Sequence, residues 1–174
     1  WMNELVEAGE RVDALRRAYL ERLAPDFEQA LSRLEPELKV SLAYYRGWEA
    51  STPLADALRQ REAADREAGY TALGPQRADL RLKWSGASAA DHLSRGQQKL
   101  VVCALKLAQG ALVDRIAGRR CIYLLDDVVA ELDRHHRGTV LGTVLASGHQ
   151  VFATGTEAAA PLAAATVFRK QRRS

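Results

Sequence analysis

The sequence predicts an α/β protein in which the strands of the second half form a parallel sheet. Residues 121–125 are a continuous apolar run, which is typical of a central parallel strand that is covered on both faces. Helical patterns at 95–116 and 133–146 lie on either side of this run, and a second strand pattern follows at 150–154. Strands that alternate with helices in this way indicate an α/β sheet.

The first part of the chain has a helical pattern. Apolar residues recur every three or four positions from 1 to 34, with charged residues between them. Pro25 is predicted to break this stretch into two helices, because proline removes a helical hydrogen bond and clashes with the preceding turn. The heptad-like spacing favours packing against a neighbouring helix that lies upstream of Trp1. A chain that opens on Trp rather than Met indicates a start that was cut or left unresolved.

The middle of the chain alternates between short elements. Strand spacing is found at 38–45, and the Ala-, Leu- and Glu-rich stretch 53–67 is predicted to be a mostly exposed helix. Two short strands are predicted on either side of the Gly74-Pro75 turn, at 70–72 and 79–84. A loop at 85–91 leads into the helix that begins at Arg95, and a last strand is predicted at 165–168.

The composition is that of a soluble globular protein, with 47% hydrophobic and 27% charged residues. No apolar run is long enough to span a bilayer, and the charged start does not resemble a signal peptide. Cys103 and Cys121 lie inside apolar runs and are interpreted as reduced core residues, so a cytoplasmic protein without a membrane partner is expected. The four histidines are interpreted as surface residues. The net charge of +3 does not by itself indicate a nucleic-acid partner, although basic residues crowd the C-terminus.

The apolar run ends in two carboxylates, Asp126 and Asp127. This order places acids at the carboxyl edge of the sheet, where α/β folds bind ligands. One carboxylate can hold a hydrated Mg²⁺, and the next can orient an attacking water. The alternative is that both residues only cap the following turn.

A second motif, Leu-Ser-Arg-Gly-Gln, begins at Leu93. Ser94 is a good N-cap for the following helix, and Gly96 allows close approach to the backbone in its first turn. Such a helix start, with free N–H groups and a hydroxyl, can bind a phosphate. Taken alone, however, the motif is better explained by an ordinary capped helix.

The two motifs together resemble the signature, Walker B and D-loop order of ABC ATPases, with the D-loop at 131–133. Within that class the chain resembles the RecF family, which is related to the SMC heads. The segments that carry this resemblance are Tyr45-Arg46-Gly47-Trp48-Glu49, Tyr70-Thr71-Ala72, 74–80, 93–110 and 118–133. RecF proteins have Asp where most ABC ATPases have Glu after the Walker B acid, and Asp127 fits that pattern.

The resemblance implies a role for each motif residue. Asp126 would hold Mg²⁺ through water, and Asp127 would position the nucleophilic water as the second catalytic carboxylate. Asp133 would reach across a dimer interface. The signature residues would contact the γ-phosphate of ATP on the opposite subunit; they are Ser94, Arg95, Gly96 and Gln97. The candidates for DNA binding are Lys99, Arg169, Lys170, Arg172 and Arg173.

The chain departs from the family pattern in two places and lacks two motifs. Gln76 stands where the family has His, and no His follows the strand at 150–154, so Thr154 or Thr156 is a candidate substitute sensor of the γ-phosphate. None of the 12 glycines is followed by Lys, so the chain has no GxxxxGK[ST] loop for phosphate. A glutamine loop is not identifiable either. ATP and Mg²⁺ binding would therefore need an N-terminal half that precedes this chain.

The resemblance thus implies the C-terminal half of an ABC-type ATPase head at 37–174, preceded by the returning limb of a helical arm at 1–36. The expected function is ATP-dependent binding of gapped and double-stranded DNA in recombinational repair. The expected partners are a second copy of the protein in an ATP-dependent homodimer, RecR and RecO, and RecA indirectly. The parent protein would be a weak DNA-stimulated ATPase, whereas this chain alone would be inactive.

Three alternatives stay open at this point. The main one is the head of another SMC-like chromosome or repair ATPase, against which the break expected at Pro25 argues. A transporter nucleotide-binding domain is disfavoured by Asp127 and by the missing switch His. An α/β domain without nucleotide chemistry would explain neither motif.

Overall fold

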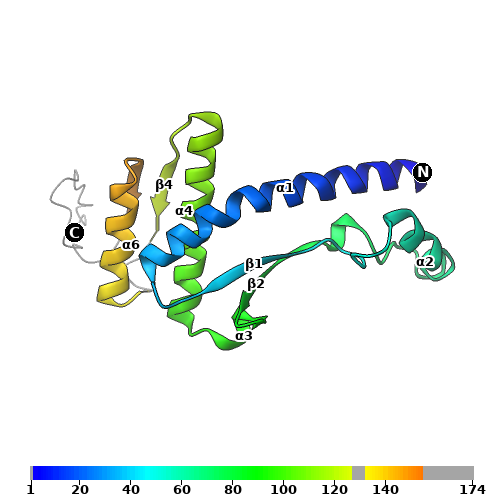
Figure 1. The fold of residues 1–174 in the computed structure, drawn as a ribbon, viewed down its shortest axis with the longest axis horizontal. Helices are drawn as coiled ribbons and strands as arrows, with labels where there is room; N and C mark the ends of the chain where they lie inside the picture. The colour runs from blue at the N-terminus through cyan, green and yellow to red at the C-terminus, as the bar shows by residue number, and fades with distance from the viewer. Residues whose placement is uncertain (1, 127–131, 155–174) are drawn as a thin grey trace, which may run out of the picture. The chain divides into compact units, whose positions relative to one another are not determined.

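The computed structural model describes residues 2–126 and 132–154. The chain divides into two compact units, Trp1–Leu112 and Val113–Ser174, and the boundary falls inside helix α4 (Arg95–Ala117). Figure 1 shows the elements of both units. The predicted strand at 165–168 lies outside the described residues.

Helix α1 (Met2–Leu34) runs without a break through Pro25, so the prediction of two helices was wrong. The buried side chains on either side of the proline explain why the helix continues: they are Leu23, Phe27, Ala30, Leu31 and Leu34. A proline inside a helix costs about 3 kcal/mol, and burial of one large apolar side chain contributes about 1.5–3 kcal/mol. Several such side chains therefore outweigh the cost of the proline.

An antiparallel sheet in the order β1-β2-β3 follows α1. The predicted strands are confirmed as β1 (Val40–Tyr45) and β2 (Asp79–Trp84), which pair from Val40 opposite Trp84 to Tyr45 opposite Asp79. Strand β3 (Ala87–Ser88) and the short helix α3 (Ala89–His92) were not predicted, and both begin within the predicted loop.

The strand predicted at 70–72 does not form. Carbonyl groups of this segment are bound by a side chain instead of a strand partner, since the Gln76 amide donates to the oxygens of Thr71 (3.1 Å) and Leu73 (2.9 Å). The segment therefore leads as a loop into the 3₁₀ turn η1 (Pro75–Arg77).

The predicted exposed helix is confirmed as α2 (Leu54–Ala68), which ends at Gly69 in a left-handed conformation. Its buried residues are Leu54, Ala57 and Leu58, and they form a small core with the fully buried Trp48. The long helix α4 (Arg95–Ala117) is also confirmed, and it is only partly buried, because Val102 and Ile116 are more than half exposed.

The second unit contains a parallel pair of strands, as predicted. Strand β4 (Ile122–Leu125) pairs with β5 (Gln150–Ala153), and helix α6 (Arg134–Ala146) connects them. The expectation that both faces of β4 are covered is wrong for this chain, since Ile122 and Leu124 are 59% and 75% exposed. In the described part of the chain, no helix has the length and apolar character needed to cross a membrane.

Candidate nucleotide site

Asp126 directly follows β4 at the carboxyl end of the parallel pair, as the sequence predicts. The Thr154 amide donates to the Leu125 carbonyl at 2.9 Å, which extends the parallel ladder by one step beyond β5. The Thr154 hydroxyl then donates to Oδ1 of Asp126 at 2.6 Å. An exposed carboxylate therefore lies at the sheet edge, held by a residue of the neighbouring strand end. Asp127 and Thr156 lie outside the described residues.

Asp133 forms the N-cap of α6. Its carboxylate accepts a hydrogen bond from the His136 amide at 2.9 Å and contacts Nδ1 of the His136 ring at 2.5 Å. The backbone hydrogen bond from His136, followed by the side-chain bond, lowers the pKa of Asp133 below its ordinary value. The role that this structure shows for Asp133 is therefore local, at the start of its own helix.

The histidines are not all surface residues. His92 and His135 are exposed, but His136 and His149 are half-buried, and the His149 ring packs edge-on against Tyr123 with centroids 5.3 Å apart. The prediction that all four are surface residues was therefore wrong for these two. His149 immediately precedes β5, and the packing of its ring against Tyr123 explains why it is half-buried.

The signature residues form a reciprocal cap at the start of α4. The Gln97 amide donates to Oγ of Ser94 (3.3 Å), and the Ser94 amide donates to Oε1 of Gln97 (3.0 Å). This is a capping box, in which a helix-start hydroxyl and the side chain three residues later satisfy each other's backbone groups. The first intrahelical bond runs from the Gln98 amide to the Ser94 carbonyl, so the amides of Arg95 and Gly96 precede the helical ladder.

Gly96 leaves room above the first turn of α4. A Cβ atom placed on Gly96 would have Oγ of Ser94 as its nearest neighbour, at 4.0 Å. The fold of this chain therefore does not require glycine at this position. A requirement for glycine there would come from a ligand or a partner that approaches the backbone.

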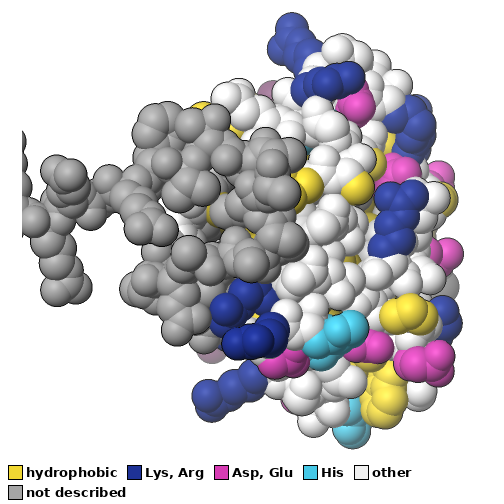
Figure 2. All heavy atoms as spheres, turned by 90° about the vertical axis from the view of Figure 1, so that its left-hand side faces the viewer, with side chains coloured by type: hydrophobic (Ala, Val, Ile, Leu, Met, Phe, Trp, Pro, Cys, Tyr) yellow, Lys and Arg dark blue, Asp and Glu magenta, His cyan; other side chains and the backbone are white. Residues whose placement is uncertain are grey.

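The basic residues give only weak support for DNA binding. Arg95 is exposed and Lys99 is half-buried, whereas Arg169, Lys170, Arg172 and Arg173 lie outside the described residues. On the described part of the face in Figure 2, the Lys and Arg side chains alternate with acidic ones and do not form one continuous area. The predicted DNA-binding residues thus remain predictions.

Two segments that carry the family resemblance meet in a structural contact. Gly47 has a φ of +100°, and a Cβ atom there would lie 2.0 Å from the Gly74 carbonyl oxygen. The Gly74 amide donates to the Gly47 carbonyl at 3.3 Å. Helix α1 adds a hydrogen bond from the Arg16 guanidinium to the Pro75 carbonyl at 2.6 Å. We call these residues, together with Asp13 and Arg46, the α1 junction.

Asp13 is the fully buried charged residue of the α1 junction. Its Oδ2 lies 3.0 Å from Arg46 and 3.2 Å from Arg17, although neither nitrogen is well aligned for a hydrogen bond. Burial, together with the neighbouring Asp13 carboxylate, raises the pKa of the Tyr44 hydroxyl. The Arg46 guanidinium also stacks over the Trp48 ring at 4.0 Å. Asp13 was not predicted as a buried residue, since a single acid in a charged helix gives no signal of burial.

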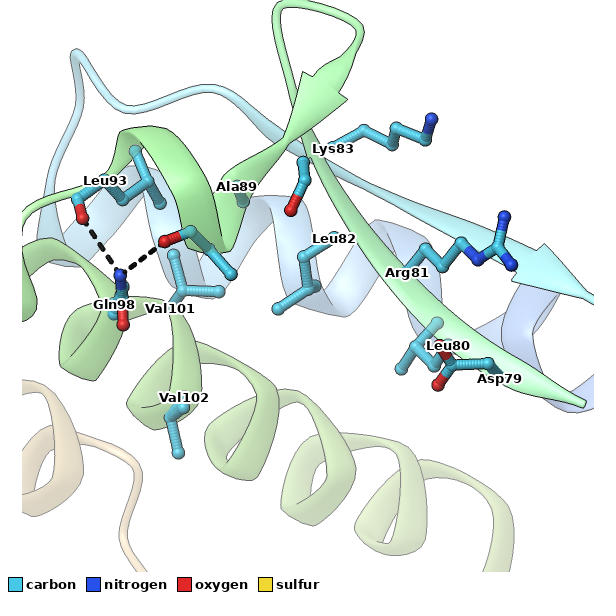
Figure 3. A pocket seen from close by; sticks show the side chains of 12 residues that line it. Asp79, Leu80, Arg81, Leu82, Lys83, Ala89, Leu93, Gln98, Val101 and Val102 are labelled. Atoms are coloured by element: carbon cyan, nitrogen blue, oxygen red, sulfur yellow. Dashed lines mark hydrogen bonds between the residues drawn. The ribbon is translucent and has the colours of Figure 1, made fainter.

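An open groove of about 600 Å³ lies between β2 and the first half of α4 (Figure 3). Its floor is apolar, with Leu82 directed toward Val101, and the Gln98 amide closes one end by donating to the Ala90 and Leu93 carbonyls. Arg81 and Lys83 point away from α4 in this view. The groove therefore suits an apolar group and is not a phosphate site.

The two cysteines are free, as expected, but half-buried and not in the core. Burial raises the pKa of the Cys103 thiol, which disfavours the reactive thiolate. Among the described residues, no group of three or more His, Cys, Asp or Glu side chains could hold a metal ion. A single carboxylate with water and phosphate oxygens is nevertheless a common set of ligands for Mg²⁺, and the exposed Asp126 fits that set.

Comparisons with known proteins agree with the family resemblance. The DNA replication and repair protein RecF of Pseudomonas aeruginosa strain PAO1 is 46% identical to this chain over 154 residues. The RecF proteins of Azotobacter vinelandii and Chromohalobacter salexigens are 49% and 48% identical over 154 and 157 residues. The chain is homologous to RecF. The resemblance predicted from the motifs is thereby confirmed.

The match covers most of this chain but less than half of each relative. It spans 88–90% of the chain and 42–44% of these RecF proteins. No family model matches the chain.

Solved structures confirm the predicted α/β fold. A structure of the recombination mediator protein RecF with ATP, described as part of the RecFOR pathway, matches with a TM-score of 0.77 at 25% identity. It covers 91% of this chain and 44% of that one. A second RecF structure, with ATPγS, matches with a TM-score of 0.73 at 26% identity.

Proposed function

We propose that this chain is the C-terminal part of a RecF-like ATPase head, and that the complete protein binds ATP and DNA in recombinational repair. The homology to RecF supports the proposal, as does the RecF structure with ATP. The observation that carries it is the placement of Asp126 at the carboxyl edge of a parallel strand pair, beside the end of the neighbouring strand.

The two acids would divide the chemistry of hydrolysis between them. Asp126 would hold a hydrated Mg²⁺, which when bound neutralises charge on the β- and γ-phosphates. Asp127 would accept a hydrogen bond from the attacking water and orient it toward the γ-phosphorus. The role of Asp127 rests on the sequence motif, because the residue lies outside the described part of the chain.

The signature loop would contact the γ-phosphate of a nucleotide bound to a second copy of the protein. Its support is the exposed start of α4, where the Arg95 and Gly96 amides precede the helical ladder and Ser94 adds a hydroxyl. Amides and the helix dipole at such an N-terminus favour an anion. Asp133 would reach the same interface after giving up or sharing its cap on α6.

The exposed face of the sheet in the second unit indicates that a further part of the head would cover it. Leu124 of β4 pairs in register with Phe152 of β5, and both are more than half exposed. Parallel strands are almost always covered on both faces. A P-loop in the part of RecF that this chain does not match would complete the site, so ATP hydrolysis is expected of the complete protein and not of this chain alone.

The wider partners of the pathway belong to the same proposal. We propose an ATP-dependent homodimer that binds gapped or double-stranded DNA and assists RecA loading together with RecO and RecR. The matched RecF structure is described as part of the RecFOR pathway, and this description supports the assignment. Lys99, Arg95 and the C-terminal basic residues are the candidates for contact with DNA phosphates.

One observation favours the second candidate, an SMC-like head. Helix α1 is continuous over 33 residues, so the break at Pro25 no longer argues against a long helical arm. The identities of 46–49% to RecF proteins still favour the first proposal.

The test is ATP hydrolysis by the complete protein on gapped DNA. Asp127→Asn should abolish most of the turnover but leave ATP binding and dimer formation unchanged. Ser94→Arg should abolish the ATP-dependent dimer, measured by light scattering, while the monomer still binds nucleotide. Unchanged turnover in the first variant would remove Asp127 from its proposed role, and loss of monomer binding in the second would indicate local misfolding.

A further inference from the structure

The contact between Thr154 and Asp126 joins two strand ends that lie far apart in the sequence. Thr154 follows β5 and Asp126 follows β4, and the parallel register places Leu125 opposite Ala153. The Thr154 amide is held by the Leu125 carbonyl at 2.9 Å. The backbone at Thr154 is therefore fixed before its side chain makes any contact.

The side chain of Thr154 then acts on one oxygen of the carboxylate. Its hydroxyl donates to Oδ1 of Asp126 at 2.6 Å, a distance typical of a strong hydrogen bond to a charged acceptor. Threonine has a stiff χ1 angle because its Cβ carries two heavy atoms. A fixed backbone and a stiff side chain together restrict the rotation of the Asp126 carboxylate.

We propose that Thr154 is a positioning residue for Asp126: it holds Oδ1 and so presents Oδ2 to a water of a bound divalent cation. The inference rests on the proposed function, because it assumes that Asp126 serves a hydrated Mg²⁺. It assigns to Thr154 a role different from that of a γ-phosphate sensor. A threonine hydroxyl has a single proton, and in this structure that proton is donated to the carboxylate.

The residues present fit such an ion. Mg²⁺ keeps several of its waters and takes only one or two carboxylates from the protein. Asp126 and Thr154 are both exposed, so a hydrated ion and a nucleotide have access to them. Partners that orient a directly ligating carboxylate typically contribute 10–100-fold to metal affinity. Because Asp126 would act through a water, an effect at the lower end of that range is expected.

The experiment compares Thr154→Val with Thr154→Ser in the complete protein. Valine keeps the branched shape and removes the hydroxyl, whereas serine keeps the hydroxyl. Binding of a fluorescent, non-hydrolysable ATP analogue is titrated with Mg²⁺ and repeated in EDTA. Asp126→Asn serves as the reference for a lost carboxylate, and thermal unfolding checks that each variant is folded.

We expect Thr154→Val to raise the Mg²⁺ concentration for half-maximal binding about tenfold. Thr154→Ser should need about the same Mg²⁺ concentration as the parent protein. Binding in EDTA should be the same for the parent protein and the two Thr154 variants. A phosphate-sensing or purely structural role would instead weaken binding equally with and without Mg²⁺, and that result would overturn the inference. Equal loss in the serine and valine variants would also overturn it.

The reference variant separates this inference from the proposed function. If Asp126→Asn leaves the Mg²⁺ dependence unchanged, the proposed cation site itself is wrong. If Asp126→Asn abolishes the Mg²⁺ dependence while Thr154→Val does not change it, the site stands and only the role of Thr154 is wrong.

Discussion

Asp13 and Asp126 are carboxylates with opposite surroundings in the same chain. Asp13 is fully buried in the α1 junction, close to Arg46 and Arg17. Asp126 is exposed at the end of β4, where Thr154 holds one of its oxygens. A buried charge with charged partners serves the fold, whereas an exposed carboxylate at a sheet edge is available to a ligand.

The same contrast divides the segments that carry the resemblance to RecF. Gly47 and Gly74 contact each other through their backbones, and Gln76 satisfies the carbonyl groups of its own loop. These residues are thus explained by packing within the first unit. The contrast teaches that a family motif can mark a structural junction as well as a chemical site, and the structure tells the two apart.

Gly47→Ala in the α1 junction is expected to have the largest effect on stability, and it would sharpen this comparison. The added Cβ would lie 2.0 Å from the Gly74 oxygen at a φ of +100°, so we expect a loss of more than about 3 kcal/mol in the free energy of unfolding. Urea denaturation of the chain measures it. Gly69→Ala is the matched control, because Gly69 has a φ of +77° but no atom within 4 Å; it should cost about 1 kcal/mol. Equal losses would show that the backbone conformation alone matters, and not the contact.

The next effect concerns the buried carboxylate. Asp13→Ala leaves the mostly buried Arg46 without its acid, and we expect a loss of about 3 kcal/mol in the free energy of unfolding. Asp56→Ala is the control, because Asp56 and its partner Arg59 are both about half exposed or more; it should cost less than about 1 kcal/mol. If Asp13→Ala proved as mild as the control, the distinction between a structural and an available carboxylate would be lost.

The smallest expected effect is at the cap of α6 and depends on pH. Because the folded-state pKa of Asp133 is lowered, its contribution is fully present above the unfolded pKa of about 4. It is lost as the pH falls through the lower folded pKa. The amide resonance of His136, followed by NMR below about pH 5, should shift in this window. Asp133→Asn keeps an oxygen for the cap and removes the titration, so a shift that persists in this variant would come from another group.

Much of the fold could be predicted from the sequence where one pattern decides the element. Helix α2 follows from its Ala-, Leu- and Glu-rich composition, and strand β4 follows from its continuous apolar run. Helices α4 and α6 and strand β5 were also predicted from the sequence pattern. The continuity of α1 could not be predicted, because it depends on side chains such as Phe27 that other parts of the chain bury. The strand predicted at 70–72 does not form, because the Gln76 side chain binds carbonyl groups of that segment. Sequence patterns do not show such hydrogen bonds from a side chain to the backbone.

The candidate site could be predicted as a set of residues but not as a set of contacts. The positions of Asp126 and Ser94 follow from the strand run and from the helix start. The hydrogen bond from Thr154 could not be anticipated, because it depends on the parallel register of β4 and β5. Parallel pairing of the two strands was expected, but their register was not. Only the register places Thr154 beside Asp126 at the end of β4.

The capping box of α4 has a consequence for how fast a phosphate could bind. Oγ of Ser94 accepts the hydrogen bond from Gln97, and a serine hydroxyl can accept and donate at the same time. The hydroxyl of Ser94 can therefore donate a hydrogen bond to a phosphate while the helix start stays capped. A loop that is ordered before the ligand arrives loses little conformational entropy on binding. Binding of a phosphate at this loop would then need little rearrangement of the loop.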